Sequence, residues 1–426
     1  MMKKSVCIVG GGASGIMAAI GAAQAGACVT LLEHQDRIGK KILLTGNGKC
    51  NLTNLEMDRH AYSISEENAL PDQVLKQFGQ NELMELFREL GMRLKVCRDS
   101  YVYPESEAAA TVVNVLRRAL DMLEVTCVTD VHIKEIHTEK GKNRKDSQFV
   151  ACTDKGNFEG DCVILACGGK SFPKTGSDGS GFGLAKMLGL KVKQDYPALT
   201  AMVCKREGQK ILAGLRTDGE VTLYIDGKPA ASDRGQVQLT DYGISGIPVF
   251  QISAPASKAL QEHKDVRIAL NLFPEMTTEE VFLEIKNQLH RFQGLPFEEA
   301  AAGMLHKKWI DYFKRQSYLK EFARAGSIPD EKIKILAKDL TAMEFPVIQT
   351  KGYDFCQVTG GGVDTKQVDC HLQSVKIPGL YIVGEMLDVV GKCGGYNLQW
   401  AFSTGYIAGC HSAGRNTISK KDSGLK

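Results

Sequence analysis

Residues 6–19 read VCIVGGGASGIMAA. The apolar run predicts a short buried strand, and three glycines follow it in G-x-G-x-x-G spacing. An Ala-rich stretch to about residue 25 predicts a helix. Residues 28–32, CVTLL, predict a second buried strand, which ends at Glu33. This order of elements is typical of a βαβ unit that binds a dinucleotide.

Each glycine of the turn has its own predicted role. Gly10 allows a tight turn, Gly12 lets a pyrophosphate approach the backbone, and Gly15 lets the helix pack close to the strand. The phosphates would lie at the positive end of the helix. Glu33 would accept hydrogen bonds from a ribose diol and repel a 2′-phosphate. The unit therefore predicts FAD or NAD rather than NADP. A glycine turn with a purely structural role is the alternative.

Length and composition exclude several classes of protein. The chain has 426 residues, which predicts two or three domains, and its net charge of +3 provides no basic field for nucleic acid. No apolar run approaches about 20 residues, so no transmembrane helix and no membrane partner are expected. The apolar run at the N-terminus ends at Gly10 without a cleavage site, so no signal peptide is expected. The 13 cysteines include no C-x-x-C pair, which predicts a reducing cytoplasm and no metal site.

A second loop, dense in Gly, Asn and Thr, follows the first unit. Residues 36–41 read DRIGKK and residues 44–54 read LTGNGKCNLTN. Such residues make tight turns with outward-pointing N–H groups, so the loop is placed to lie along a pyrophosphate or a flavin ring. A solvent-exposed loop is the alternative. Joined to the glycine turn, the loop resembles the YhiN/BaiN-type family of FAD-dependent oxidoreductases, and the resemblance extends over nearly the whole chain.

The resemblance carries functional expectations. It implies that the first domain binds FAD through Gly10, Gly12, Gly15 and Glu33, with residues 45–54 on the flavin side. It also implies an NAD(P)H-dependent enzyme. One member type reduces the conjugated double bond of a 3-oxo steroid or bile acid, and a similar substrate is expected here.

Three later segments are expected to return to the same site. Residues 162–169, CVILACGG, predict a buried strand followed by small residues near the pyrophosphate. Residues 379–385, GLYIVGE, predict another buried strand, and residues 391–401, GKCGGYNLQWA, predict a glycine turn that opens a helix. The N-terminus of that helix would face the N1–O2 edge of a flavin. Asp178 is expected near the cofactor, with a helix cap as the alternative.

The cofactor-binding residues predicted from these segments and from the resemblance are Gly10, Gly12, Ala13, Ser14, Gly15, Glu33, Lys41, Thr45, Gly46, Asn47, Asn51, Ala166, Gly168, Gly169, Asp178, Gly384, Glu385, Gly394, Gly395, Tyr396, Asn397 and Leu398.

The expected fold is α/β, with a Rossmann-like FAD-binding domain of the two-dinucleotide-binding type and two insertions. The FAD-binding domain would be discontinuous, over residues 1–191 and 345–426. Short alternating runs predict an antiparallel, barrel-like β domain at 192–258. Helical periodicity predicts a small helical cap domain at 259–344.

The predicted reaction is reduction of a conjugated double bond in a small apolar enone, with FAD as the hydride carrier. The chain has one dinucleotide fingerprint, so NADH or NADPH would bind transiently as electron donor. Protonation at the α-carbon needs a general acid, for which Tyr396, Lys49 and Cys393 are candidates. Structural roles for these three are the alternative. A flavin-dependent oxidase or dehydrogenase of an amine or alcohol, and a non-catalytic FAD-binding regulatory protein, are the competing functions. The sequence does not predict the oligomeric state.

Overall fold

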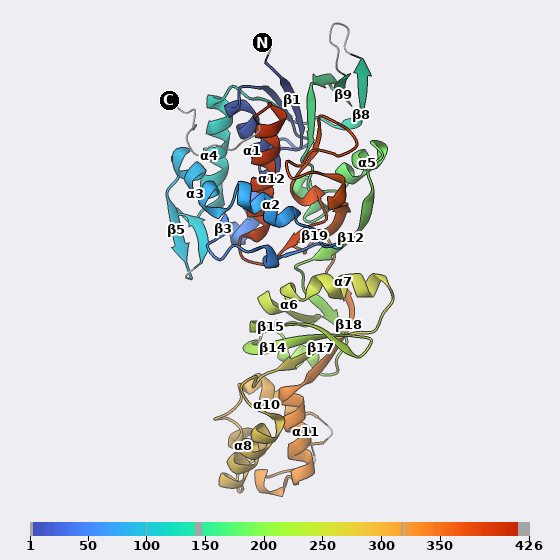
Figure 1. Ribbon diagram of the computed structural model, residues 1–426. Helices are drawn as coiled ribbons and strands as arrows, with labels where there is room; N and C mark the ends of the chain where they lie inside the picture. The colour runs from blue at the N-terminus through green and yellow to red at the C-terminus, as the bar shows by residue number, and fades with distance from the viewer. Residues whose placement is uncertain (1–2, 99, 141–146, 317, 321, 416–426) are drawn as a thin grey trace. The chain divides into compact units, whose positions relative to one another are not determined.

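A computed structural model describes residues 3–98, 100–140, 147–316, 318–320 and 322–415. The chain forms two compact units (Figure 1). The first comprises Met1–Tyr196 and Gln357–Lys426, and the second comprises Pro197–Cys356.

The first unit is built on a five-stranded parallel sheet with the order β20-β11-β1-β2-β7. The central strands are continuous apolar runs because both faces of a parallel sheet are buried. Val6, Cys7, Ile8 and Val9 are at most 2% exposed. The predicted Rossmann-type domain is therefore confirmed. The strands are β1 (Ser5–Val9), β2 (Cys28–Leu32), β7 (Thr126–Val128), β11 (Cys162–Leu165) and β20 (Leu380–Ile382).

Two helices that are far apart in the sequence lie side by side against this sheet: α1 (Ala13–Gln24) and α12 (Tyr396–Ser412) (Figure 1). Their backbones approach closely at glycines. A Cβ at Gly405 would overlap the carbonyl oxygen of Ser14, and one at Gly409 would overlap that of Ala18. The N-terminal unit and the C-terminal segment are thus parts of one core.

Smaller elements surround this core. Short sheets form in the orders β3-β6-β5, β10-β9-β8, β12-β19 and β21-β4. Their strands are β3 (Thr53–Asn54), β4 (Tyr62–Ser63), β5 (Leu94–Cys97), β6 (Tyr101–Pro104), β8 (Ile133–Lys140), β9 (Ser147–Thr153), β10 (Gly156–Gly160), β12 (Val192–Ala198), β19 (Val358–Val363) and β21 (Val390–Gly391). The further helices are α2 (Leu70–Gln77), α3 (Gln80–Glu89), α4 (Ala109–Met122) and α5 (Ser180–Met187).

The second unit contains a closed antiparallel barrel with the order β13-β16-β15-β14-β17-β18. The barrel strands are β13 (Met202–Cys204), β14 (Arg216–Ile225), β15 (Lys228–Leu239), β16 (Gly243–Gly246), β17 (Val266–Asn271) and β18 (Met343–Thr350). The helices of this unit are α6 (Ile247–Gln251), α7 (Ser253–Gln261), α8 (Thr278–Arg291), α9 (Phe297–Ala300), α10 (Lys307–Lys314) and α11 (Asp330–Thr341).

The boundaries inside the second unit differ from the expected ones. β17 lies beyond the expected end of the β domain at 258, and β18 includes residues 345–350, which were expected in the FAD-binding domain. Both strands are needed to close the barrel, since β17 pairs with β14 and β18 pairs with β13. Barrel and helices also share one apolar core, which includes Phe345 of β18, Tyr312 of α10 and Leu336 of α11. The two expected insertions therefore form a single compact unit.

Within the described residues, no helix is both long enough and apolar enough to span a membrane.

Candidate active site

The turn after β1 is packed tightly on one side and open on the other. Gly10 has a φ of +107°, and a Cβ there would lie 2.5 Å from the carbonyl oxygen of Ala166. A Cβ at Gly15 would overlap the carbonyl oxygen of Gly10. A Cβ at Gly12, in contrast, would have no neighbour within 4 Å. Gly10 and Gly15 are thus required by packing, whereas Gly12 leaves open space beside the backbone.

This open space lies at an uncapped helix N-terminus. Gly12 is the N-cap of α1, no side chain caps the helix, and its first turn contains no acidic residue. The first N–H groups of a helix have no partner within it, and they carry the positive end of its dipole. The beginning of α1, including Ala13 and Ser14, therefore fits a pyrophosphate.

Glu33 is held beside the same turn. Its side chain lies at the end of β2, and the residue is 8% exposed. Gly11 N–H donates to Oε2 at 2.7 Å, and Gln35 N–H donates to Oε1 at 2.8 Å. A carboxylate offers about four acceptor positions. Two backbone donors thus orient Glu33 and leave capacity for the hydroxyls of a ribose.

A polar network joins four segments around Glu385. Lys41 Nζ lies 2.8 Å from Oε2 of Glu385. The hydroxyl of Ser171 and the N–H of Thr359 both donate to Oε1 at 2.8 Å, and Lys41 also donates to Ser171. Burial by itself raises the pKa of Glu385, but the Lys41 ammonium and the other donors hold it below its ordinary value. Glu385 is therefore a carboxylate that ties these segments together.

This network adds residues that the sequence did not single out. Ser171 and Thr359 were not predicted, because a lone Ser or Thr in a glycine-rich segment carries no distinguishing signal. Gly169, which was predicted, packs against Thr359, and a Cβ there would lie 2.7 Å from Oε1 of Glu385. The network thus brings two predicted residues, Lys41 and Glu385, into direct contact.

The N-terminus of α12 is closed in by the Asn-rich loop. Gly395 is its N-cap, and a Cβ there would lie 2.6 Å from the backbone of Thr53. Asn54 Nδ2 donates to the carbonyl oxygen of Gly394 at 3.0 Å. With its amide oriented to suit its neighbours, Asn51 accepts from Gly395 N–H at 3.3 Å. Two segments predicted from the sequence are thus in contact, although they lie about 340 residues apart.

Several predicted side chains have local structural roles. Asn397 braces the turn before α12, since it accepts from Gly391 N–H at 2.8 Å and donates to the carbonyl oxygen of Gly391 at 2.9 Å. Thr45 donates to the carbonyl oxygen of Ile42 at 2.7 Å. Asp178 precedes Gly179, the N-cap of α5, and accepts from Ser180 N–H at 2.9 Å. Of the other predicted residues, Gly46 and Asn47 lie in the Asn-rich loop and have positive φ. Gly168 lies beside Ser177, and Gly384 lies beside Ser14. Leu398 lies in the first turn of α12.

The three proton-donor candidates differ in their surroundings. Lys49 is half-exposed and lies 2.5 Å from Glu107, which raises the pKa of this lysine. Tyr396 is 8% exposed, donates to the carbonyl oxygen of Glu56 at 3.1 Å, and has its pKa raised by burial. Cys393 is half-buried, with its sulfur 3.8 Å from Oε1 of Gln357. Tyr396 and Cys393 belong to one turn, whereas Lys49 is held by a surface ion pair.

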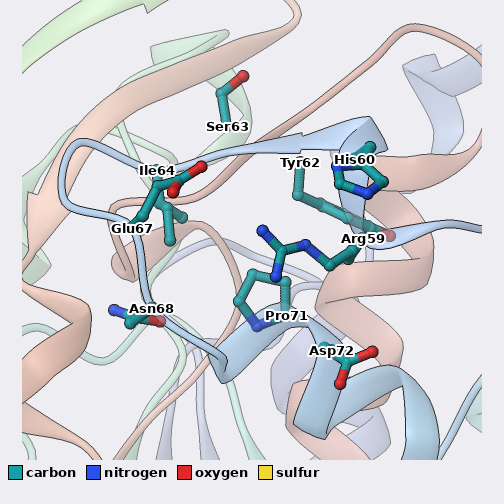
Figure 2. A pocket seen from close by; sticks show the side chains of 9 residues that line it. All are labelled: Arg59, His60, Tyr62, Ser63, Ile64, Glu67, Asn68, Pro71 and Asp72. Carbon is teal, nitrogen blue, oxygen red and sulfur yellow. The ribbon is translucent and has the colours of Figure 1, made fainter.

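A pocket of about 260 Å³ lies beside this region and was not predicted from the sequence (Figure 2). It opens between β4 and the start of α2. β4 pairs with β21, and Tyr62 OH donates to the carbonyl oxygen of Tyr396 at 2.9 Å, so the pocket adjoins the turn before α12. Its lining is mostly polar: Arg59, His60, Tyr62, Ser63, Ile64, Glu67, Asn68, Pro71 and Asp72.

Comparison with known proteins gives matches along nearly the whole chain. The model of the HI0933-like protein Rossmann domain family matches residues 4–411. The 3-dehydro-bile acid delta(4,6)-reductase of Clostridium scindens is 40% identical over 412 residues, which cover 96% of this chain and 98% of the relative. The ribosomal RNA dihydrouridine synthase of Haemophilus influenzae is 29% identical over 94% of this chain and 96% of its own. That of Escherichia coli is 27% identical over 95% and 97%.

Proposed function

The chain belongs to the HI0933-like family and is an FAD-dependent oxidoreductase; from this premise we propose that it reduces a carbon–carbon double bond conjugated to a carbonyl group in a steroid-like small molecule. The family resemblance drawn from the first 54 residues is confirmed by the full-length matches. The observation that carries the substrate class is the 40% identity to a bile acid reductase over 96% of the chain.

The residues present fit FAD. The open face at Gly12 and the uncapped start of α1 would hold the pyrophosphate, and Glu33 would accept from the ribose. The start of α12, with Gly394 and Gly395, would face the flavin ring. When bound there, FAD supplies the hydride for the reduction. The protein's part is to bind and orient both molecules and to deliver a proton.

For the proton we favour Tyr396 over the other two candidates. Its phenol carries a proton at neutral pH, and burial raises its pKa further. Tyr396 is also the first residue of α12, where the flavin ring is expected. Lys49 is held at the surface by Glu107. Tyr396 would donate to the α-carbon of the enone after the hydride has reached the β-carbon.

The electron donor is proposed to be NADH or NADPH. The described residues include one strand–turn–helix unit with the dinucleotide fingerprint, which is the one after β1. A reduced nicotinamide would therefore bind transiently and leave before the substrate enters.

Uridine in ribosomal RNA is the competing substrate. The two ribosomal RNA dihydrouridine synthases match at 29% and 27% identity over more than nine-tenths of the chain. The 5,6 double bond of uracil is conjugated to a carbonyl group, so its reduction requires the same hydride transfer and protonation as reduction of an enone. A net charge of +3 over 426 residues favours a small molecule over a polyanion.

Anaerobic flavin spectroscopy tests this proposal. Purified FAD-loaded protein is reduced with NADH or NADPH, freed of excess nucleotide, and mixed with a 3-oxo-4-ene bile acid. We expect the oxidised flavin spectrum to return and a saturated 3-oxo product to appear by mass spectrometry. The saturated 3-oxo bile acid is the matched control and should leave the flavin reduced.

The other outcomes separate the alternatives. Reoxidation by rRNA lacking dihydrouridine, with no response to the enone, would replace the small-molecule proposal by the RNA one. Failure of both nucleotides to reduce the flavin would refute the proposed donors. Rapid reoxidation by oxygen coupled to an amine or alcohol would favour the oxidase alternative.

A further inference from the structure

Three side chains that can bind a metal meet on one face of the β8–β9 hairpin. Glu135 and His137 are two residues apart on β8, so they point to the same face, and Cys152 on β9 is the register partner of Glu135. His137 Nδ1 lies 3.7 Å from Glu135 Oε1 and 3.9 Å from Cys152 Sγ. All three ligand atoms lie within 4.8 Å of one another.

These separations suit a single metal ion. Bonds of about 2.3 Å to sulfur and about 2.0 to 2.1 Å to nitrogen and oxygen at tetrahedral angles would place the ligand atoms roughly 3.4 to 3.6 Å apart. The two measured separations from His137 are only a few tenths of an ångström longer. The third separation, between Glu135 and Cys152, is at most 4.8 Å, so side-chain rotations would complete the geometry by shortening it.

A second observation concerns the other ring nitrogen of His137. Nε2 lies 3.0 Å from Oε1 of Glu139, the next residue on the same face. If Nε2 donates to that carboxylate, Nδ1 carries the lone pair and directs it at Glu135 and Cys152. Metal-binding histidines commonly have this carboxylate partner on the second nitrogen. A lone pair facing a carboxylate is repulsive unless a cation lies between them.

We propose that Glu135, His137 and Cys152 bind one divalent transition-metal ion, with Zn²⁺ preferred, and that Glu139 positions the imidazole. Thiolate and imidazole ligands favour Zn²⁺ over Mg²⁺ or Ca²⁺. Three protein ligands leave the fourth position to water. The metal would join β8 to β9 and stabilise the hairpin. This site is independent of the flavin chemistry. The sequence, which contains no C-x-x-C pair, predicted no metal site.

Cobalt substitution provides a direct test. The full-length, FAD-loaded protein is freed of metal, titrated with Co²⁺, and followed as a difference spectrum against the cobalt-free protein. We expect a thiolate-to-cobalt charge-transfer band that saturates at one equivalent and disappears when Zn²⁺ is added. Cys152→Ser should abolish the band, and His137→Ala should weaken binding at least tenfold. Glu139→Gln should weaken it by less, since it acts through His137.

The controls separate the site from other cysteines and from misfolding. Cys127→Ser removes an exposed thiol elsewhere and should retain the full band. Flavin content and the rate of flavin reduction should be unchanged in Cys152→Ser, which lies outside the proposed active site. Absence of the band in the native protein, or its persistence in Cys152→Ser, would overturn the proposal. In those cases His137 only bridges Glu135 and Glu139, and the hairpin holds no metal site.

Discussion

The N-termini of α1 and α12, both in the first unit, have different surroundings. No side chain caps either helix, but at the start of α1 Gly12 has no neighbour within 4 Å on its Cβ side. At the start of α12, Gly395 is packed against the backbone of Thr53, and Asn54 donates to Gly394. The first terminus is local in sequence and open to a ligand. The second depends on a loop from the other end of the chain.

The difference indicates that the two termini have different roles. An open, uncapped terminus can accept the diphosphate of a dinucleotide with its own N–H groups. A terminus braced from outside can hold a planar ring in a fixed orientation, because its backbone is positioned by tertiary contacts. Substitutions at the first should therefore affect cofactor affinity, whereas those at the second should affect stability.

The largest expected effect is on FAD affinity, when a side chain fills the open space at Gly12. Gly12→Val should lower FAD affinity by at least about a hundredfold, or about 2.7 kcal/mol, because the side chain would occupy the proposed phosphate space. The apo-protein should still fold, since that space is empty of protein atoms. Titration of apo-protein with FAD, followed by flavin fluorescence, measures the affinity.

Gly294→Val is the matched control, because a Cβ there also has no neighbour within 4 Å but lies in the second unit. Its FAD affinity should equal that of the native protein. Unchanged affinity in Gly12→Val would mean that the turn has a purely structural role.

Removing the ion pair between Lys41 and Glu385 should have the next largest effect. Lys41→Met would leave Glu385 without its counter-ion in a mostly buried position, where both side chains are about one-fifth exposed. We expect a loss of about 2–3 kcal/mol in the free energy of unfolding. Lys40→Met removes an ion pair with the exposed Asp36 and a hydrogen bond to Gln35 Oε1, and it should cost clearly less than Lys41→Met. Urea denaturation of both variants measures the difference, and equal losses would contradict the proposed importance of the Glu385 network.

Removing a contact at the start of α12 should have a smaller effect on the free energy of unfolding. Asn54→Ala removes the donor to Gly394 and the acceptor for Glu56 N–H from a residue that is 3% exposed. We expect a cost of about 1–2 kcal/mol, because buried backbone groups lose their partners. Asn114→Ala, on the exposed face of α4, should be neutral. If Asn54→Ala weakens FAD binding without lowering the melting temperature, the contrast between the two termini is wrong.

The smallest expected effect is a pH dependence at the other end of α12. Burial, then the neighbouring His371, hold the pKa of His411 below its ordinary value of 6.5. Asp369 opposes this shift and Lys4 adds to it, while Tyr381 OH lies 2.9 Å from Nδ1. The neutral ring therefore stabilises the fold above pH 6.5, and this stability is lost as the pH falls through the lower, folded-state pKa. Melting temperatures across this range should fall less in His411→Asn than in the native protein.

Much of the first unit was predictable because its signals are local. The glycine turn, the buried strands at 162–165 and 379–385, and the turn before α12 all carry their own residue pattern. The barrel boundaries were missed for a different reason. β18 alternates buried Met343, Phe345 and Val347 with exposed Glu344, a pattern visible in the sequence. Its partners lie more than 70 residues away, however, so the sequence could not show which sheet it completes.

The sequence by itself determined the dinucleotide unit, since the spacing of its glycines, the close approach of Gly15 to Gly10 and the position of Glu33 all depend on residues within one βαβ segment. The family and the flavin chemistry followed from motifs of the same local kind. Only the tertiary structure decided that Lys41 pairs with Glu385, that Asn54 braces α12, and that Glu135 meets Cys152. Each of these contacts joins segments that only the folded backbone brings within bonding distance.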